Sequence, residues 1–321
     1  MRHVLILRAL GLGDFLTGVP AYRGLRSSYR DAVLILAAPG YLEPLIPLTG
    51  AIDRLLPTSG LGRLGLVDPA PDVAVNLHGR GPQSIDELLR DGPGKLITHR
   101  HPRRPQVAGI DWQEDLHEVQ RWCRLLELAG ISADPRDLRL APPYLPAPVS
   151  GAIVIHPGAA APARRWPAER FGAAASLLRD AGLPIVVTGT SAEKVAADTA
   201  IRSADLAASS NLCGELDLAE LAALIASARL VISGDTGVAH LASAYGTPSV
   251  ILFGPTPPSR WGPPPDGPHT ALWHGSTGDP HSDQPDAGLL EIEVEDVVRE
   301  AQARLQARRR PHWSTAGAPV M

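Results

Sequence analysis

A short turn near the start of the chain carries the first side chain that could do chemistry. Residues 4–7 form an apolar run typical of a buried strand, and Gly11, Gly13 and Asp14 follow it where a helical pattern begins. Two glycines between a strand and a helix could indicate a dinucleotide site, but Leu16 replaces the third glycine of that fingerprint. Asp14 would also repel a pyrophosphate. The spacing predicts a general base at Asp14, with a helix-capping carboxylate as the alternative.

The second half of the chain offers groups that suit a bound diphosphate. His156, Pro157 and Gly158 end another apolar run, and Arg164 and Arg165 lie a few residues beyond it. Guanidinium groups make forked hydrogen bonds to phosphate oxygens, so an arginine pair at this place favours a diphosphate site. The alternative is that the two arginines form only a solvated face.

A further candidate for anion binding lies between an apolar run and a helical pattern at residues 233–240. The bare backbone of Gly237 and the hydroxyl of Thr236 would stand at a helix N-terminus, where backbone N–H groups favour an anion. His240 would lie one turn into that helix. Asp235 could instead be only a helix cap, and His240 a structural, half-buried histidine. Because such loops follow successive strands, we interpret them together as one anion-binding region.

These loops need strands and helices to position them, and the sequence alternates the two. Such alternation predicts an α/β fold with two Rossmann-like, doubly wound domains that face each other across a cleft. Further strands are predicted at 33–37, 73–77, 152–156, 185–188, 230–233 and 249–253. The proline-rich segment 141–148 is the best boundary, so we predict domains at 1–145 and 146–295 and a C-terminal helix and tail at 296–321.

Composition argues against several classes of function. The net charge of −4 offers no footprint for nucleic acid. Cys123 and Cys213 are too few for a disulfide framework, and the histidines and aspartates between residues 272 and 290 fit no standard metal pattern. We expect no metal and no cofactor. The N-terminal apolar run is too short for a signal peptide, and no stretch resembles a membrane span, so we expect a cytoplasmic protein.

Taken together, these motifs resemble glycosyltransferase family 9, the bacterial ADP-heptose heptosyltransferases. DTGVAH at 235–240 followed by FGPT at 253–256 is the most specific part of the resemblance. The other matching segments occur in order along the chain: RALGLGD at 8–14, HPG at 156–158, RRWP at 164–167 with Phe171, VTG at 187–189, NLCG at 211–214 and WGP at 261–263.

The resemblance implies a GT-B fold and an inverting, metal-independent transfer from a nucleotide sugar, ADP-heptose first. No Asp-x-Asp triplet occurs in the sequence, which agrees with this. Asp14 would take the proton from the acceptor hydroxyl. Arg164 stands where the family has a lysine before x-Trp-Pro, and it still suits stabilisation of a leaving diphosphate. The C-terminal helix would cross back onto the first domain. The other donor-binding residues that the resemblance implies are His156, Gly158, Thr188, Gly189, Asp235, Thr236, Gly237 and His240.

On the acceptor side the resemblance is looser. Gly13, His78 and Arg80 are the predicted acceptor-binding residues, and the alternative for the last two is that they satisfy backbone groups of their loop. The basic cluster at 99–104 could meet an anionic acceptor or a phospholipid surface, but we interpret it as a solvated loop. The acceptor stays open among a glycan such as lipopolysaccharide core, a lipid-linked molecule approached by peripheral membrane contact, and a small natural product.

Two other functions fit the same fold class. A nucleotide-sugar epimerase would also have two such domains, but the order of the motifs argues against it. A non-catalytic protein that binds a nucleotide sugar would keep the donor pocket. The arginine at position 164 is the one hint of this second alternative, and the retained Asp14 argues against it.

Overall fold

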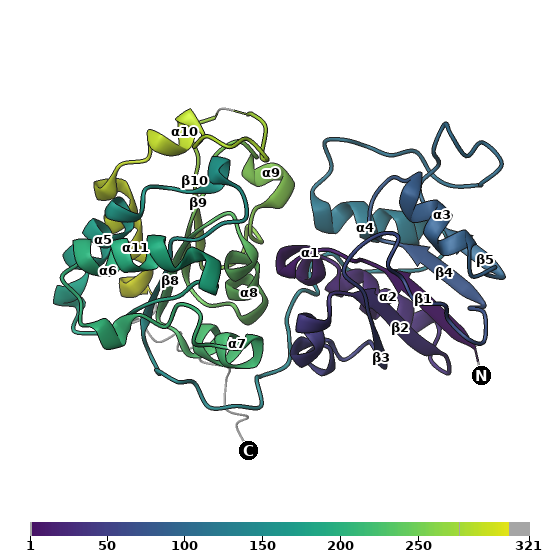
Figure 1. The fold of residues 1–321 in the computed structure, drawn as a ribbon, viewed down its shortest axis with the longest axis horizontal. Helices are drawn as coiled ribbons and strands as arrows, with labels where there is room; N and C mark the ends of the chain where they lie inside the picture. Colours follow the sequence, from purple (N-terminus) through teal and green to yellow (C-terminus); the bar gives the residue numbers. More distant parts are fainter. Residues whose placement is uncertain (1, 276, 308–321) are drawn as a thin grey trace, which may run out of the picture.

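The computed structural model describes residues 2–275 and 277–307, and within them two α/β units lie side by side (Figure 1). Each unit has a five-stranded parallel sheet, in the order β3-β2-β1-β4-β5 in the first and β10-β9-β8-β6-β7 in the second. The strands are β1 His3–Leu7, β2 Val33–Ala38, β3 Arg54–Pro57, β4 Val73–Asn76, β5 Lys95–Ile97, β6 Ile153–His156, β7 Ile185–Val187, β8 Leu230–Gly234, β9 Ser249–Leu252 and β10 His269–Leu272.

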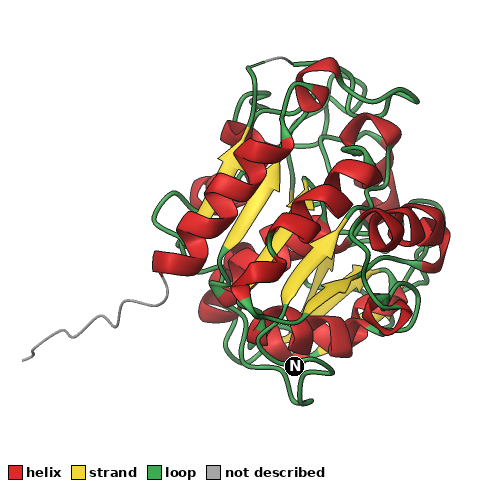
Figure 2. Cartoon of the chain, turned by 90° about the vertical axis from the view of Figure 1, so that its left-hand side faces the viewer, coloured by secondary structure: helices red, strands yellow, loops and turns green. Residues whose placement is uncertain are grey.

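Helices lie on both sides of the strands (Figure 2). Those of the first unit are α1 Leu12–Thr17, α2 Val19–Ser28, α3 Gln83–Leu89 and α4 Glu118–Leu128, with 3-10 turns η1 Gly40–Leu45 and η2 Pro47–Thr49. Those of the second are α5 Ala168–Leu177, α6 Lys194–Ser203, α7 Leu218–Ser227, α8 Gly237–Tyr245, α9 Pro258–Trp261, α10 Ala287–Leu290 and α11 Val294–Ala307, with 3-10 turns η3 Pro162–Arg164, η4 Arg179–Ala181, η5 Ser191–Glu193 and η6 Ala208–Ser210.

Alternation along the central strands decides which helices cover which face. In β1, Val4 and Ile6 belong to an apolar cluster with residues of α1, α2 and α4, whereas Leu5 and Leu7 pack with α3. Successive side chains of a strand point to opposite faces, so an uninterrupted apolar run fits a strand that is covered on both sides. β6 follows the same rule, with helices α5, α6 and α11 on one face and α7 and α8 on the other.

The order of the strands places the loops of interest at one place in each sheet. β1 pairs with both β2 and β4, and β6 pairs with both β7 and β8. The chain therefore changes direction across the sheet beside β1 and again beside β6. In open α/β sheets ligands bind at such points, beyond the carboxyl ends of the strands.

The two units share apolar packing. The cluster that contains Val4 and Ile6 also contains Val238 and Leu241 of α8 and Leu224 of α7. Helix α1 lies against α8 where the units meet (Figure 1). Burial of apolar side chains across this contact stabilises the arrangement of the two sheets relative to each other.

The predicted fold class and the predicted strands are confirmed, and each of these strands differs from its prediction by one residue at one end. Residues 15–25, which read as one helical pattern, form two helices that join at Gly18. Pro20 in the first turn of α2 has no N–H to continue α1. The boundary between the predicted domains falls after residue 145, in the described segment between α4 and β6, and its position stays a prediction.

The C-terminal helix differs from the expectation. Within the described residues, α11 packs on α5, β8, β9 and β10 of the second unit and does not cross to the first. Val297, Val298, Ala301 and Leu305 form an apolar stripe, which is buried in the second core. A helix with one such stripe packs where the stripe is covered. Residues 308–321 of the predicted tail lie outside the described residues.

Candidate active site between the two domains

Asp14 lies in the first turn of α1, at the carboxyl end of β1. The residue that caps this helix is Gly11, without a side-chain hydrogen bond, so the structure does not support the capping alternative for Asp14. The Asp14 side chain is 27% exposed, and its Oδ1 lies 3.5 Å from Arg8 Nη2. A half-buried carboxylate beside a fixed cation fits a group that exchanges a proton with a ligand.

Arg8 is completely buried and anchors this corner of the first domain. Its Nη2 donates to Thr17 Oγ1 at 2.9 Å and to Glu118 Oε1 at 3.1 Å. Its Nε and Nη1 donate to the backbone oxygens of Asp14 and Leu77. Because nearly every donor of the guanidinium has a partner, its position beside the Asp14 carboxylate is fixed.

The electrostatic surroundings of Asp14 come from both domains. Burial raises the pKa of Asp14 above its usual value, and Arg8 opposes that effect. Glu118 also raises the pKa, whereas Arg164 of the second domain lowers it. A carboxyl group with a raised pKa is a better base once it is ionised.

Arg164 and Asp235 face this region from the second domain. Arg164 Nη1 donates to the backbone oxygen of Asp235 at 3.4 Å, and its buried Nε has no hydrogen-bond partner among the described residues. Burial raises the pKa of Asp235 to about 6, Arg164 opposes this, and Asp14 adds to it. An unsatisfied buried guanidinium donor needs an acceptor oxygen, which a phosphate would supply.

The first turns of α1 and α8 touch. A Cβ at Gly13 would lie 2.8 Å from His240 Cδ2, and a Cβ at Gly237 would lie 2.8 Å from Leu12 Cβ. Burial lowers the pKa of His240 to about 4, so its ring is neutral at pH 7. Thr236 caps α8, so Asp235 is not the cap. The predicted acceptor residue Gly13 therefore lies directly against the predicted donor residue His240.

Four further predicted donor residues gather at the ends of β6 and β7. His156 Nδ1 and Thr188 Oγ1 are 3.0 Å apart. Glu193, which the sequence analysis missed, lies against the backbone of Gly158 and Gly189 so closely that a Cβ at either glycine would meet its side chain. Its carboxylate accepts hydrogen bonds from Thr190, and the Thr-x-x-Glu spacing of a capping box was the available signal.

The predicted acceptor residues are only partly brought together. His78, after β4, is half-buried. Burial, and to a smaller extent the nearby positive charge of Arg8, lowers the pKa of His78 to about 4. Its Nδ1 has no hydrogen-bond partner among the described residues. Arg80 is exposed in the same loop. In the basic cluster Arg100 pairs with Asp111 at 2.9 Å and Arg104 with Asp86 at 2.5 Å, which fits the solvated-loop interpretation for the arginines, whereas His99 is buried.

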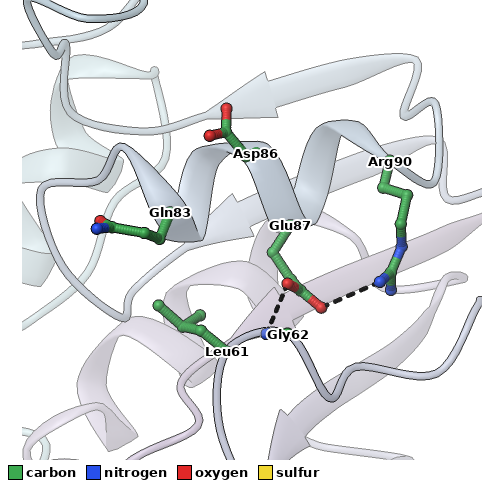
Figure 3. Close-up of a pocket in the computed structure, with 6 residues that line it drawn as sticks. All are labelled: Leu61, Gly62, Gln83, Asp86, Glu87 and Arg90. Atoms are coloured by element: carbon green, nitrogen blue, oxygen red, sulfur yellow. Dashed lines mark hydrogen bonds and ion pairs between the residues drawn. The ribbon is translucent and has the colours of Figure 1, made fainter.

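A separate cavity of about 430 Å³ lies in the first domain, between the loop after β3 and helix α3 (Figure 3). Glu87 in its wall accepts from the Gly62 N–H at 2.8 Å and pairs with Arg90 at 3.3 Å. Its lining includes none of the predicted site residues.

Neither a metal site nor a membrane-spanning helix is found in the described part of the chain. In residues 2–275 and 277–307, no three His, Cys, Asp or Glu side chains gather closely enough to hold a metal ion. Cys123 and Cys213 are free and buried. Among the described residues, none of the helices combines the length and the apolar character that a membrane span requires.

Comparison with known proteins assigns this chain to a family. The sequence model described as glycosyltransferase family 9 (heptosyltransferase) matches residues 109–277. Lipooligosaccharide heptosyltransferase 2 of Haemophilus ducreyi is 33% identical, over 80% of this chain and 84% of that protein. Lipopolysaccharide heptosyltransferase 2 of Escherichia coli K12 is 25% identical, over 79% of this chain and 83% of its own length.

The fold agrees with solved structures. The structure of Escherichia coli ADP-heptose LPS heptosyltransferase II superposes with a TM-score of 0.77 at 21% identity, and the match covers 97% of this chain and all of that one. The two-domain arrangement is thus the GT-B fold expected from the sequence. The chain belongs to glycosyltransferase family 9 and is a heptosyltransferase-like glycosyltransferase.

Proposed function

We propose that the enzyme transfers a heptose from ADP-heptose to an acceptor hydroxyl, with inversion and without a metal ion, and that Asp14 is the general base. One observation supports the proposal above the others: Asp14 of the first domain lies near enough to the second domain that Arg164 lowers the pKa of Asp14 and Asp14 raises the pKa of Asp235. The names of the curated relatives support heptose as the sugar and lipopolysaccharide core as the first acceptor to test.

The positions of these groups suit an in-line displacement. Inversion needs the acceptor oxygen and the leaving diphosphate on opposite faces of the anomeric carbon. In this proposal the acceptor oxygen forms the new bond to that carbon, its proton passes to Asp14, and the bond to the diphosphate breaks. Binding the two substrates on opposite domains orients the reacting atoms before the reaction begins.

The charge that develops on the diphosphate would be stabilised by the second domain. Arg164 Nε–H has no partner among the described residues, and α8 begins two residues after Asp235, so the N-terminal N–H groups of α8 would add positive partial charge to this side. Together with His156, Thr188 and Glu193 they form the proposed donor side. Arginine in place of the family lysine keeps the positive charge and adds a forked donor.

The acceptor side of the proposal consists of His78, Arg80 and the end of α1. His78 is neutral at pH 7, and its unpartnered Nδ1 can accept or donate one hydrogen bond to a sugar hydroxyl. We also propose a cytoplasmic enzyme that meets a lipid-linked acceptor by peripheral contact. The buried free thiols of Cys123 and Cys213 fit a reducing compartment.

The test is Asp14→Asn, with release of ADP from ADP-heptose measured in the presence of heptose-deficient lipopolysaccharide. We expect kcat to fall by about 10²- to 10⁴-fold, the usual contribution of a general base. ADP affinity, measured by calorimetry, should change by less than about threefold, because the proposal places Asp14 on the acceptor side, away from the diphosphate. Asp31→Asn, an exposed carboxylate of the same domain, is the matched control.

Two outcomes would contradict the proposal. A loss of ADP affinity equal to the loss of rate would make Asp14 a structural residue. An isomerised sugar from ADP-heptose incubated without acceptor would indicate the epimerase alternative, against which the family assignment already argues.

A further inference from the structure

Glu118, the first residue of α4, is a buried carboxylate whose role the proposed mechanism does not use. Its Oε1 accepts from Arg8 Nη2 at 3.1 Å and from Trp122 Nε1 at 2.8 Å, and its Oε2 accepts from Arg121 Nε at 3.2 Å. Donors from three directions fix both oxygens. A buried carboxylate held in this way is rigid enough to orient another group.

The group that Glu118 orients is Arg8, which connects it to Asp14. The same Arg8 nitrogen, Nη2, lies 3.1 Å from Glu118 Oε1 and 3.5 Å from Asp14 Oδ1. One guanidinium thus serves two carboxylates, and the shorter contact goes to Glu118. Because the charge of Arg8 is shared, it neutralises Asp14 less than it would in an isolated pair.

The first turn of α4 is also attached to the second domain. His117 Nδ1 accepts from the Val119 N–H at 3.2 Å and caps α4, while its Nε2 donates to the backbone oxygen of Gly262 at 3.0 Å. Beside it, Arg260 Nη2 lies 2.6 Å from Asp115 Oδ1. His117 and Glu118 are adjacent, so the contact with the second domain holds the helix turn that presents Glu118.

We propose that Glu118 is a positioning residue for Asp14, acting through Arg8, and that His117 ties this cluster to the second domain. The inference rests on the proposed function, in which Asp14 is the base. Asp14 is then placed and tuned only when the two domains are in contact, so that proton removal is coupled to assembly of the complete site.

The charges around Asp14 give the direction of the effect. The charged groups near Asp14 are Arg8 after β1, Glu118 of α4, Arg164 of η3 and Asp235 at the end of β8. The phenols of Tyr22 in α2 and Tyr41 in η1 are the neutral titratable groups that interact with it. Glu118 acts in the same direction as burial, and the two arginines act against it. Removal of the Glu118 charge should therefore lower the pKa of Asp14.

The first experiment is Glu118→Gln, which keeps the shape and the oxygen that accepts from Arg8 but removes the charge. The Asp14 carboxyl is followed by NMR in protein labelled with ¹³C at aspartate Cγ, and its signal is assigned by its absence in Asp14→Asn. We expect its titration midpoint to move to lower pH, and the acidic limb of turnover to move with it. Glu127→Gln, an exposed carboxylate of the same helix, should leave the midpoint unchanged.

An unmoved Asp14 midpoint in Glu118→Gln would overturn the proposal, since a merely structural carboxylate would act on stability alone. The midpoint is measured without acceptor or donor. A failure of the proposed function, seen as full turnover in Asp14→Asn, is therefore distinguishable from a failure of this inference.

The second experiment tests the tie through His117. His117→Asn keeps a capping side chain for α4 but is too short to reach Gly262. We expect it to displace the Asp14 midpoint, and we expect no further displacement when it is added to Glu118→Gln. Arg260→Gln, which removes only the exposed ion pair nearby, should leave the midpoint unchanged. If the two substitutions displace the Asp14 midpoint additively, or if His117→Asn alone leaves it unchanged, the proposed role of His117 is wrong.

Discussion

Ionisation of Asp235 should cost the folded protein a measurable amount of stability. The residue is 6% exposed at the end of β8, and burial raises its pKa from 3.8 to about 6 against the opposing effect of Arg164. Asp235→Asn keeps the shape of the protonated carboxyl and cannot ionise. The difference in stability between the two proteins therefore isolates the cost of this one charge.

The size and sign follow from linkage. A rise of about two pKa units corresponds to about 3 kcal/mol, at about 1.4 kcal/mol per unit. Below pH 3.8 the carboxyl is protonated in both the folded and the unfolded state, and the stability that protonated Asp235 contributes to the folded protein is fully present. As pH rises through 6 the folded state must ionise Asp235, and that stability is lost. Relative to the parent, Asp235→Asn should gain about 3 kcal/mol between pH 4 and pH 7.

The assay is urea unfolding of both proteins at pH 4, 5, 6 and 7, followed by circular dichroism and tryptophan fluorescence. Groups far from position 235 titrate equally in the two proteins, so they cancel in the difference. Asp283→Asn, an exposed aspartate of the same domain, should show no such gain. If the difference between Asp235→Asn and the parent is flat across this range, Asp235 ionises without cost and the reasoning from burial is wrong.

Three other outcomes are expected. ADP should bind more tightly to the parent as pH falls from 7 to 5, by up to about tenfold per unit above pH 6, and calorimetry on Asp235→Asn should lose this dependence. Gly13→Ala should cost about 1–3 kcal/mol in thermal unfolding, because its Cβ would lie 2.8 Å from His240, whereas Gly79→Ala meets nothing within 4 Å. Arg164→Met should lower kcat at least about 100-fold in the ADP-release assay, and Arg164→Lys should lose less than about tenfold.

The sequence predicted the parts of the fold that local pattern determines. β1, β4, β6 and β8 are buried apolar runs, and the polar residues that follow them are where the candidate site was found. β3, β5 and β10 were missed because they are short edge strands with partly exposed residues. Such strands are defined by pairing with a neighbour, which one stretch of sequence does not show.

The residues that surround Asp14 could not be predicted in the same way. Glu118 is separated from Arg8 by 110 positions. A capping residue at 117 does not indicate that the next residue pairs with a distant arginine, and an arginine after a strand does not indicate a distant carboxylate as its partner. Arg8 reads as the residue that ends an apolar run. Its complete burial makes sense only when Glu118 and Trp122 are in place around it, because a buried cation requires paired acceptors.

Gly13 and Gly237 show what a local pattern can and cannot indicate. A glycine between a strand and a helix indicates that something approaches the backbone, and the sequence analysis interpreted that partner as substrate. In the structure the partner is the other domain, since a Cβ at either position would collide across the contact between α1 and α8. This close approach brings Asp14 within the electrostatic reach of Arg164 and Asp235. The acidity of both carboxyls is therefore a property of the assembled pair of domains, which the sequence of either domain alone does not predict.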